Sequence, residues 1–222
     1  MTRKRSPLEF RKQQYLQGLL LQETEYVIHL FTEGETERRY VEDLARNKCV
    51  KIRLEWQNSN PNILYKKALD WTRKHTDFFK STKEKARHVV WVLFDDDEKT
   101  DLIEKTAELV RANQGSRWPI SIGYQKPCIE LWAALCVKGN ASGLPGMHSA
   151  MESALARLMH GYDHNANRYF DLGKMSHTDA ACTLARQWES TYGAFPKCTG
   201  ARYYACIHGL VELIRGTTDK VR

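Results

Sequence analysis

Residues 27–137 alternate between short apolar runs and amphipathic segments, and this order restricts the fold more than any other feature of the chain. Apolar runs and polar–apolar alternation predict strands over residues 27–31, 51–56, 89–94 and 120–124. Apolar residues at helical spacing predict helices over residues 35–47, 61–75, 101–113 and 129–137. Strands that alternate with helices form parallel sheets with right-handed crossovers. We therefore predict an α/β fold with a Rossmann-like parallel sheet of about four strands flanked by helices.

The pattern changes after Gly139. A loop rich in Gly, Ser and Pro is followed by helical periodicity over residues 147–160, 178–190 and 201–215. We divide the chain into a basic N-terminal arm or helix (1–24), an α/β core (25–138) and a helical C-terminal addition (139–222). The addition is expected to extend the core rather than to fold as an independent domain.

Acidic residues cluster directly after two of the predicted strands. Residues 33–37 (EGETE) follow the first strand, and residues 95–98 (DDDE) follow the third. Clustered carboxylates repel one another unless a cation neutralises them. In parallel sheets, sites lie beyond the carboxyl ends of the strands, which brings both clusters to one edge. Oxygen ligands of this kind suit Mg²⁺ or Mn²⁺, whose usual chemistry involves phosphate groups.

Individual acids in the two clusters differ in their expected roles. Asp95 and Asp97 project to the same side if the extended backbone continues past the strand, and could then hold a metal ion together. An ordinary acidic turn is the alternative. Glu33, before a glycine that permits a tight turn, is placed to move a proton. Glu37 follows one helical turn later on the same face, whereas Glu35 is explained by the preference for acids at a helix start.

Glu130 lies inside the very apolar predicted helix 129–137. A charge in such a helix is rarely buried without a partner. Its place just after the fourth strand would bring it to the same edge as the acidic clusters. Two interpretations stay open: Glu130 is a further member of the metal site, or it forms a salt bridge with a core arginine.

The chain carries 34 Lys and Arg against 27 Asp and Glu, a net charge of +7. A basic protein with an acidic site is typical of enzymes that bind polyanions, although basic residues also serve solubility. Eight of these basic residues fall within residues 66–88. The candidates for gripping a nucleic-acid backbone are Lys66, Lys67, Lys74, Lys80, Lys83, Lys85 and Arg87. For any one of them a solvated helix face is the simpler explanation.

The six cysteines include no CxxC pair, which favours reduced, core-filling thiols. Cys198, Cys206 and His208 could bind zinc, but their spacing matches no standard ligand pattern. The N-terminus lacks the apolar region of a signal peptide, and no run is long enough to span a membrane. We therefore expect a cytoplasmic protein.

Three motifs arrive in an order that resembles the RloB family of the Toprim superfamily of metal-dependent nucleases, topoisomerases and primases. They are residues 31–37 (FTEGETE) with Tyr40, residues 94–98 (FDDDE) and residues 127–132 (PCIELW), and the resemblance covers roughly residues 25–135. It implies a Toprim fold, with Glu33 as the acid/base residue of a Mg²⁺ site held by Asp95 and Asp97. The chain departs from the family pattern at Asp96, where an arginine is expected, and at residues 133–134, where alanines replace bulkier residues.

Relatives of this family occur in bacterial defence loci, and related Toprim proteins cut nucleic acid, including transfer RNA. The chain is too short to carry the additional domains of a topoisomerase or a primase. The leading hypothesis is therefore a Mg²⁺-dependent endonuclease acting on RNA, with a protein partner from a defence operon and a homodimer as one possible state. The alternatives are a DNA nuclease, a phosphatase or nucleotide hydrolase, and a binding or sensor subunit that does not cleave.

Overall fold

The computed structural model describes residues 25–80, 86–97, 99–113, 120–162 and 170–217. Within them, five strands form one sheet in the order β2-β1-β3-β4-β5. The strands are β1 (Tyr26–Thr32), β2 (Val50–Trp56), β3 (Arg87–Asp95), β4 (Ile120–Lys126) and β5 (Tyr204–Ala205). The first four are parallel, and β5 pairs antiparallel with the end of β4. The predicted α/β class and its parallel sheet are confirmed.

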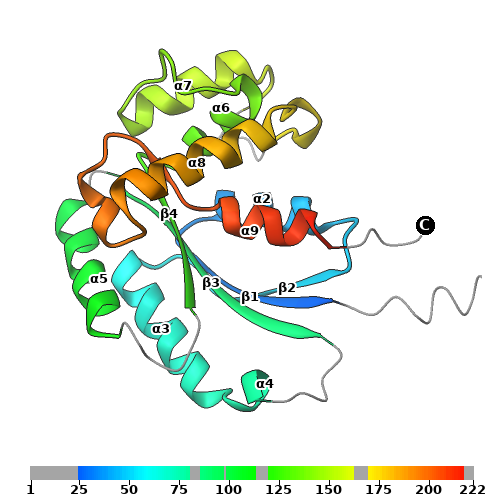
Figure 1. Ribbon diagram of the computed structural model, residues 1–222, viewed down its shortest axis with the longest axis vertical. Helices are drawn as coiled ribbons and strands as arrows, with labels where there is room; N and C mark the ends of the chain where they lie inside the picture. The colour runs from blue at the N-terminus through cyan, green and yellow to red at the C-terminus, as the bar shows by residue number, and fades with distance from the viewer. Residues whose placement is uncertain (1–24, 81–85, 98, 114–119, 163–169, 218–222) are drawn as a thin grey trace, which may run out of the picture.

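Helices cover both faces of the sheet. They are α2 (Glu35–Ala45), α3 (Pro61–Lys74), α4 (Asp77–Lys80), α5 (Thr100–Ala112), α6 (Ile129–Lys138), α7 (His148–Leu158), α8 (Thr178–Tyr192) and α9 (His208–Arg215). Short 3-10 turns cover Leu172–Lys174 and Lys197–Gly200. Figure 1 shows α3 and α5 on one side of the sheet, with α2, α8 and α9 on the other.

The helix predicted over residues 201–215 is wrong in its first half. Tyr204 and Ala205 instead pair with Lys126 and Gln125 of β4, and α9 begins only at His208. The reason is tertiary: the outer side of β4 offers free backbone groups at its end, and pairing them satisfies donors and acceptors that would otherwise be buried.

Both faces of β1 and β3 are buried. Phe31, Val92 and Phe94 face the layer of α3 and α5, whereas Leu30 and Leu93 face the layer of α2, α6 and α9. Because side chains alternate between two apolar layers, these strands appear in the sequence as continuous apolar runs.

The C-terminal third shares this core. α9 packs against α2 and α8, while α7 and α8 pack against α6. Leu210 and Ile214 belong to the same buried cluster as Val41 and Leu131. The apolar core therefore runs without a break across residue 138.

The strand register brings the two acidic clusters to one edge. Thr32, the last residue of β1, pairs with Leu93, and Asp95, the last residue of β3, pairs with Gln125 of β4. The backbone N–H of Glu33 donates to the carbonyl of Leu93 at 3.1 Å, which continues the pairing by one residue. No helix in the described part of the chain is long and apolar enough to cross a membrane.

Candidate functional site

A cavity of about 230 Å³ opens at the carboxyl edge of the sheet. It gathers all five acids that the sequence singled out, although they come from three separate segments. Its lining consists of Glu33, Gly34, Glu35, Thr36, Glu37, Asp95, Asp97, Ile129, Glu130 and His148. We call this cavity the acidic cleft.

Glu33 follows β1 and spans the two acidic clusters. Its Oε1 lies 2.6 Å from Nζ of Lys99, and its Oε2 accepts a longer hydrogen bond, 3.4 Å, from the backbone N–H of Asp95. Burial raises the pKa of Glu33, while Lys99 opposes that change. A carboxyl group with a raised pKa exchanges protons more readily near neutral pH than an exposed glutamate does.

Asp95 is the most buried of the three aspartates in the DDDE cluster, at 5% exposure. Its Oδ2 accepts a hydrogen bond of 3.1 Å from the backbone N–H of Ile129, in the first turn of α6. Its Oδ1 is buried and has no hydrogen-bond partner among the described residues. Burial, followed by the charges of Glu37 and Glu130, raises the pKa of Asp95 well above its ordinary value.

Asp97 lies beyond the strand, in a turn. Its φ of 45° is in the left-handed region, which aspartate tolerates better than most residues. The expectation that extended backbone continues from Asp95 to Asp97 is therefore wrong, because β3 ends at Asp95. The turn nevertheless leaves Asp97 in the acidic cleft, so both side chains line the same cavity.

Two cations contact Asp97. Its Oδ2 lies 3.0 Å from Nζ of Lys99, and its Oδ1 lies 2.8 Å from Nδ1 of His148 at the start of α7. Although burial opposes ionisation, His148 and Lys99 together lower the pKa of Asp97. The same contact with Asp97 raises the pKa of His148 to about 9, so this imidazole is cationic at neutral pH.

Asp96 does not line the acidic cleft. Its carboxylate accepts a hydrogen bond from the hydroxyl of Tyr124 and lies 3.7 Å from Nζ of Lys126, both on β4. The acid that replaces the expected arginine thus joins β3 to β4 and adds no carboxylate to the cleft.

Glu37 reaches back over the start of α2. Its Oε2 accepts a hydrogen bond of 3.0 Å from the backbone N–H of Gly34, half of the reciprocal cap found at helix starts. A Cβ at position 34 would lie 2.8 Å from that oxygen, so any larger residue would displace the carboxylate. Burial, together with Glu130 and Glu33, raises the pKa of Glu37 to about 7.

Glu130 is buried in the first turn of α6, at 1% exposure, and lines the acidic cleft. The hydroxyl of Tyr162 donates a hydrogen bond of 2.6 Å to its Oε1. Its side chain therefore lies in the same cavity as Glu33, Asp95 and Asp97.

A buried hydrogen bond of 2.7 Å joins the helices that carry these acids. The indole Nε1–H of Trp132 on α6 donates to the hydroxyl of Tyr40 on α2. Both rings are almost fully buried. The bond fixes the start of α6 relative to α2, and thereby Glu130 relative to Glu37.

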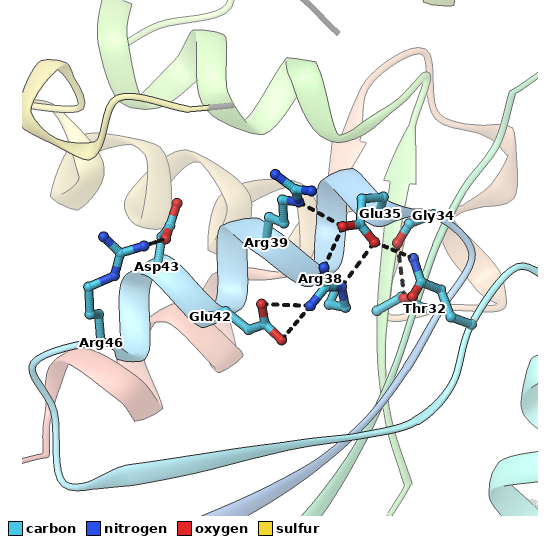
Figure 2. A network of polar contacts seen from close by, with 9 residues as sticks. Thr32, Gly34, Glu35, Arg38, Arg39, Glu42, Asp43 and Arg46 are labelled. Carbon is cyan, nitrogen blue, oxygen red and sulfur yellow. Dashed lines mark hydrogen bonds and ion pairs between the residues drawn. The ribbon is translucent and has the colours of Figure 1, made fainter. Parts of the chain in front are cut away.

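Glu35 differs from the other acids because its oxygens are engaged at the surface. Figure 2 shows it among Arg38 and Arg39 of the same helix, and it also accepts a hydrogen bond of 2.8 Å from Gln57. These donors, led by Arg38, lower the pKa of Glu35 to about 2. Glu35 lies in the first turn of α2, where acidic side chains are favoured.

The candidate nucleic-acid contacts are spread over both ends of the sheet. Lys74 ends α3 and the exposed Arg87 begins β3, which places them at the edge opposite the acidic cleft. Lys66 and Lys67 are exposed in the middle of α3, and Nζ of Lys67 lies 4.1 Å from the ring centroid of Trp56. Lys83, Lys85 and the side chain of Lys80 lie outside the described residues.

Trp56 is 40% exposed at the carboxyl end of β2, the end that faces the acidic cleft. The next residue, Gln57, donates to Glu35, which lines the cleft. Trp56 therefore lies at the carboxyl end of the sheet, and Lys67 of the basic stretch contacts it there.

Sequence reasoning missed two residues of the cleft, Lys99 and His148. Lys99 directly follows the four acids in the sequence, and this position could have predicted that it pairs with them. His148 lies 51 positions after Asp97, and only the packing of α7 on α6 brings it to the acids. Its neighbours in the sequence carry no motif.

One group of His, Cys, Asp or Glu side chains in the described residues has the mutual spacing of a metal site. It comprises Cys128, Glu130 and His148, whose ligand atoms all lie within 4.8 Å of one another. All six cysteines are buried and free. Cys198, Cys206 and His208 do not form such a group: the thiol of Cys206 instead contacts the backbone of Ile122 and Tyr124.

A larger cavity, about 420 Å³, lies beside the outer side of β4, between Trp91, Ile122 and His208. It contains none of the clustered acids. We place the functional site in the smaller cleft because charge, burial and the carboxyl ends of the strands coincide there.

Comparison with protein families found one match in keeping with these motifs. The family described as RloB-like protein matches residues 28–214, which is most of the chain. Searches of curated proteins and of solved structures found no match.

Proposed function

Since the chain belongs to the RloB-like family, within the Toprim superfamily, we propose that it is a Mg²⁺-dependent endonuclease that cleaves RNA. The family supports a nuclease-related role. The metal, the substrate and the residue roles are our proposal.

The observation that carries the proposal is the unpartnered Oδ1 of Asp95. It is buried in a cleft lined by six acidic side chains from the two clusters and α6, and no hydrogen-bond donor among the described residues reaches it. An orphaned buried carboxylate oxygen is costly unless a cation binds it. The donor set of Glu33, Asp95 and Asp97, with oxygen ligands alone, fits Mg²⁺ or Mn²⁺.

Bound there, Mg²⁺ would neutralise a scissile phosphate and lower the pKa of a water molecule. Glu33 would take the proton from the attacking water or return one to the leaving oxygen, a task that matches its raised pKa. Lys99, which contacts both Glu33 and Asp97, would hold these carboxylates in place and add positive charge beside the phosphate.

Trp56 and Lys67 support a nucleic-acid substrate. An exposed indole next to an ammonium group offers a stacking surface for an unpaired base and a contact for its phosphate. Because such bases are common in RNA loops, we favour RNA, and transfer RNA among RNAs, over DNA. A function in antiphage defence with a partner protein completes the proposal.

The experiment compares the wild type with Asp95→Asn on end-labelled tRNA and on plasmid DNA. Asp101→Asn, an exposed change in the first turn of α5, is the matched control. We expect Asp95→Asn, and EDTA treatment of the wild type, to reduce tRNA cleavage by at least about 10²-fold. Asp101→Asn should cut tRNA at the wild-type rate.

Undiminished cleavage in Asp95→Asn or in EDTA would refute the mechanism. Faster cleavage of plasmid than of tRNA would show a DNA nuclease. If the folded wild type cuts neither substrate with Mg²⁺ or Mn²⁺, the chain is the binding or sensor subunit instead.

A further inference from the structure

Three side chains with different ligand atoms meet beside the acidic cleft, and two of them, Glu130 and His148, line it. Cys128 immediately precedes α6, Glu130 lies in its first turn, and His148 begins α7. Their sulfur, oxygen and nitrogen ligand atoms lie within 4.8 Å of one another. We propose that these three residues bind a thiophilic divalent cation of the Zn²⁺ class, at a site separate from that of Glu33, Asp95 and Asp97.

The ligand types select the ion. Thiolate and imidazole favour Zn²⁺ and exclude Mg²⁺, which takes oxygen ligands and retains water. Three protein ligands leave one position of a tetrahedral ion open, which is the arrangement of catalytic rather than structural zinc sites. The cation would therefore face the cleft with an open position for water or for a substrate oxygen.

The surroundings of the three residues match those of ligands in known metal sites. Glu130 accepts a hydrogen bond from the hydroxyl of Tyr162, and Nδ1 of His148 lies 2.8 Å from a carboxylate oxygen of Asp97. Such outer contacts orient ligating carboxylates and histidines. Tyr162 and Asp97 are not ligands at this site. They would act as the outer contacts that hold Glu130 and His148 in position.

Burial and charge also point to a cation at this place. Cys128 and Glu130 are 0% and 1% exposed, so both ligand side chains are shielded from solvent. The cations Lys99 and His148 both contact Asp97, which is not a member of the group. A divalent ion between Cys128 and Glu130 would compensate the buried negative charge of these two ligands.

Binding requires ligands without protons. As the metal bonds form, the thiol of Cys128 and the imidazolium of His148 each release a proton to solvent, and no oxidant or reductant takes part. The proposal does not depend on nucleic-acid cleavage.

The test is a titration of the full-length, metal-free protein with Co²⁺, followed by optical spectroscopy. We expect one equivalent to produce a thiolate-to-cobalt charge-transfer band, which Zn²⁺ abolishes and excess Mg²⁺ does not. Cys128→Ser should lose the band. Cys136→Ser, which removes another buried thiol of α6, should keep it.

Tyr162→Phe removes the hydrogen bond to Glu130 and should weaken Zn²⁺ binding by about 10–100-fold. If circular dichroism shows Cys128→Ser to be unfolded, His148→Gln takes its place and should weaken Zn²⁺ binding by at least about tenfold. No charge-transfer band in the wild type, an intact band in Cys128→Ser, or unchanged affinity in His148→Gln would overturn the proposal. Mg²⁺-dependent cleavage of tRNA is measured separately, so either proposal can fail alone.

Discussion

Replacing Glu37 by glutamine should stabilise the metal-free protein, and the gain should depend on pH. Burial, with Glu130 and Glu33, raises the pKa of Glu37 from 4.5 to about 7. Because the folded state binds the proton more tightly than the unfolded state, stability falls as pH rises through this range. At about 1.4 kcal/mol per pH unit, full ionisation above pH 7 costs the fold about 3 kcal/mol.

Glutamine removes this cost and keeps an oxygen that can accept the hydrogen bond from the backbone N–H of Gly34. Below pH 4.5 the two side chains are both neutral, so Glu37→Gln should melt with the wild type. Between pH 4.5 and 7 the difference should grow, and above pH 7 it should level off at roughly 6–12 °C.

Thermal melts followed by circular dichroism at half-unit intervals from pH 4 to 8, in EDTA, measure the difference. Glu104→Gln, the same substitution at an exposed position of α5, is the control and should give no pH-dependent gain. Saturating Mg²⁺ should narrow the gap, since a cation in the cleft offsets the repulsion that glutamine relieves. A difference that does not vary with pH, or a Glu37→Gln protein less stable than the wild type at pH 8, would refute the reasoning.

Two further changes test a contact of the cleft and the buried hydrogen bond between α2 and α6. Lys99→Met should lower the free energy of unfolding of the metal-free protein by about 1 kcal/mol, because it removes a partly exposed ammonium group between Glu33 and Asp97. Urea unfolding with and without Mg²⁺ measures this loss. An equal loss in both conditions would argue against the charge explanation. Tyr40→Phe leaves the buried indole N–H of Trp132 without its acceptor. The substitution should lower the free energy of unfolding by about 1–3 kcal/mol at every pH, which is roughly 2–12 °C in thermal melts. An unchanged melting temperature would contradict the role given to that bond.

The part of the fold that could be predicted is the part with strong local signals. β1 and β3 are buried on both faces, so each appears as an apolar run, and the acids that end them mark the carboxyl edge. β5 could not be predicted, because a strand of two residues is too short to show a hydrophobic periodicity. Its pairing depends instead on where β4 ends.

The sequence predicted which acids line the cleft better than it predicted which cations contact them. The acids follow strand ends, and topology alone places strand ends together. The geometry of Asp97 was not predictable in this way, since it depends on a turn with φ of 45° rather than on the strand. His148 was missed because its position is set by packing between α6 and α7, for which the sequence offers no short-range signal.

The boundary expected at residue 138 therefore divides the residues of the cleft. Asp97 lies before that boundary and His148, its partner at 2.8 Å, lies after it; Glu130 and Tyr162 are separated in the same way. A fragment ending at residue 138 would keep every acid of the cleft but lose the imidazolium beside Asp97 and the hydroxyl on Glu130. Since uncompensated buried carboxylates are costly, the C-terminal third is part of what allows six acids to share one cavity.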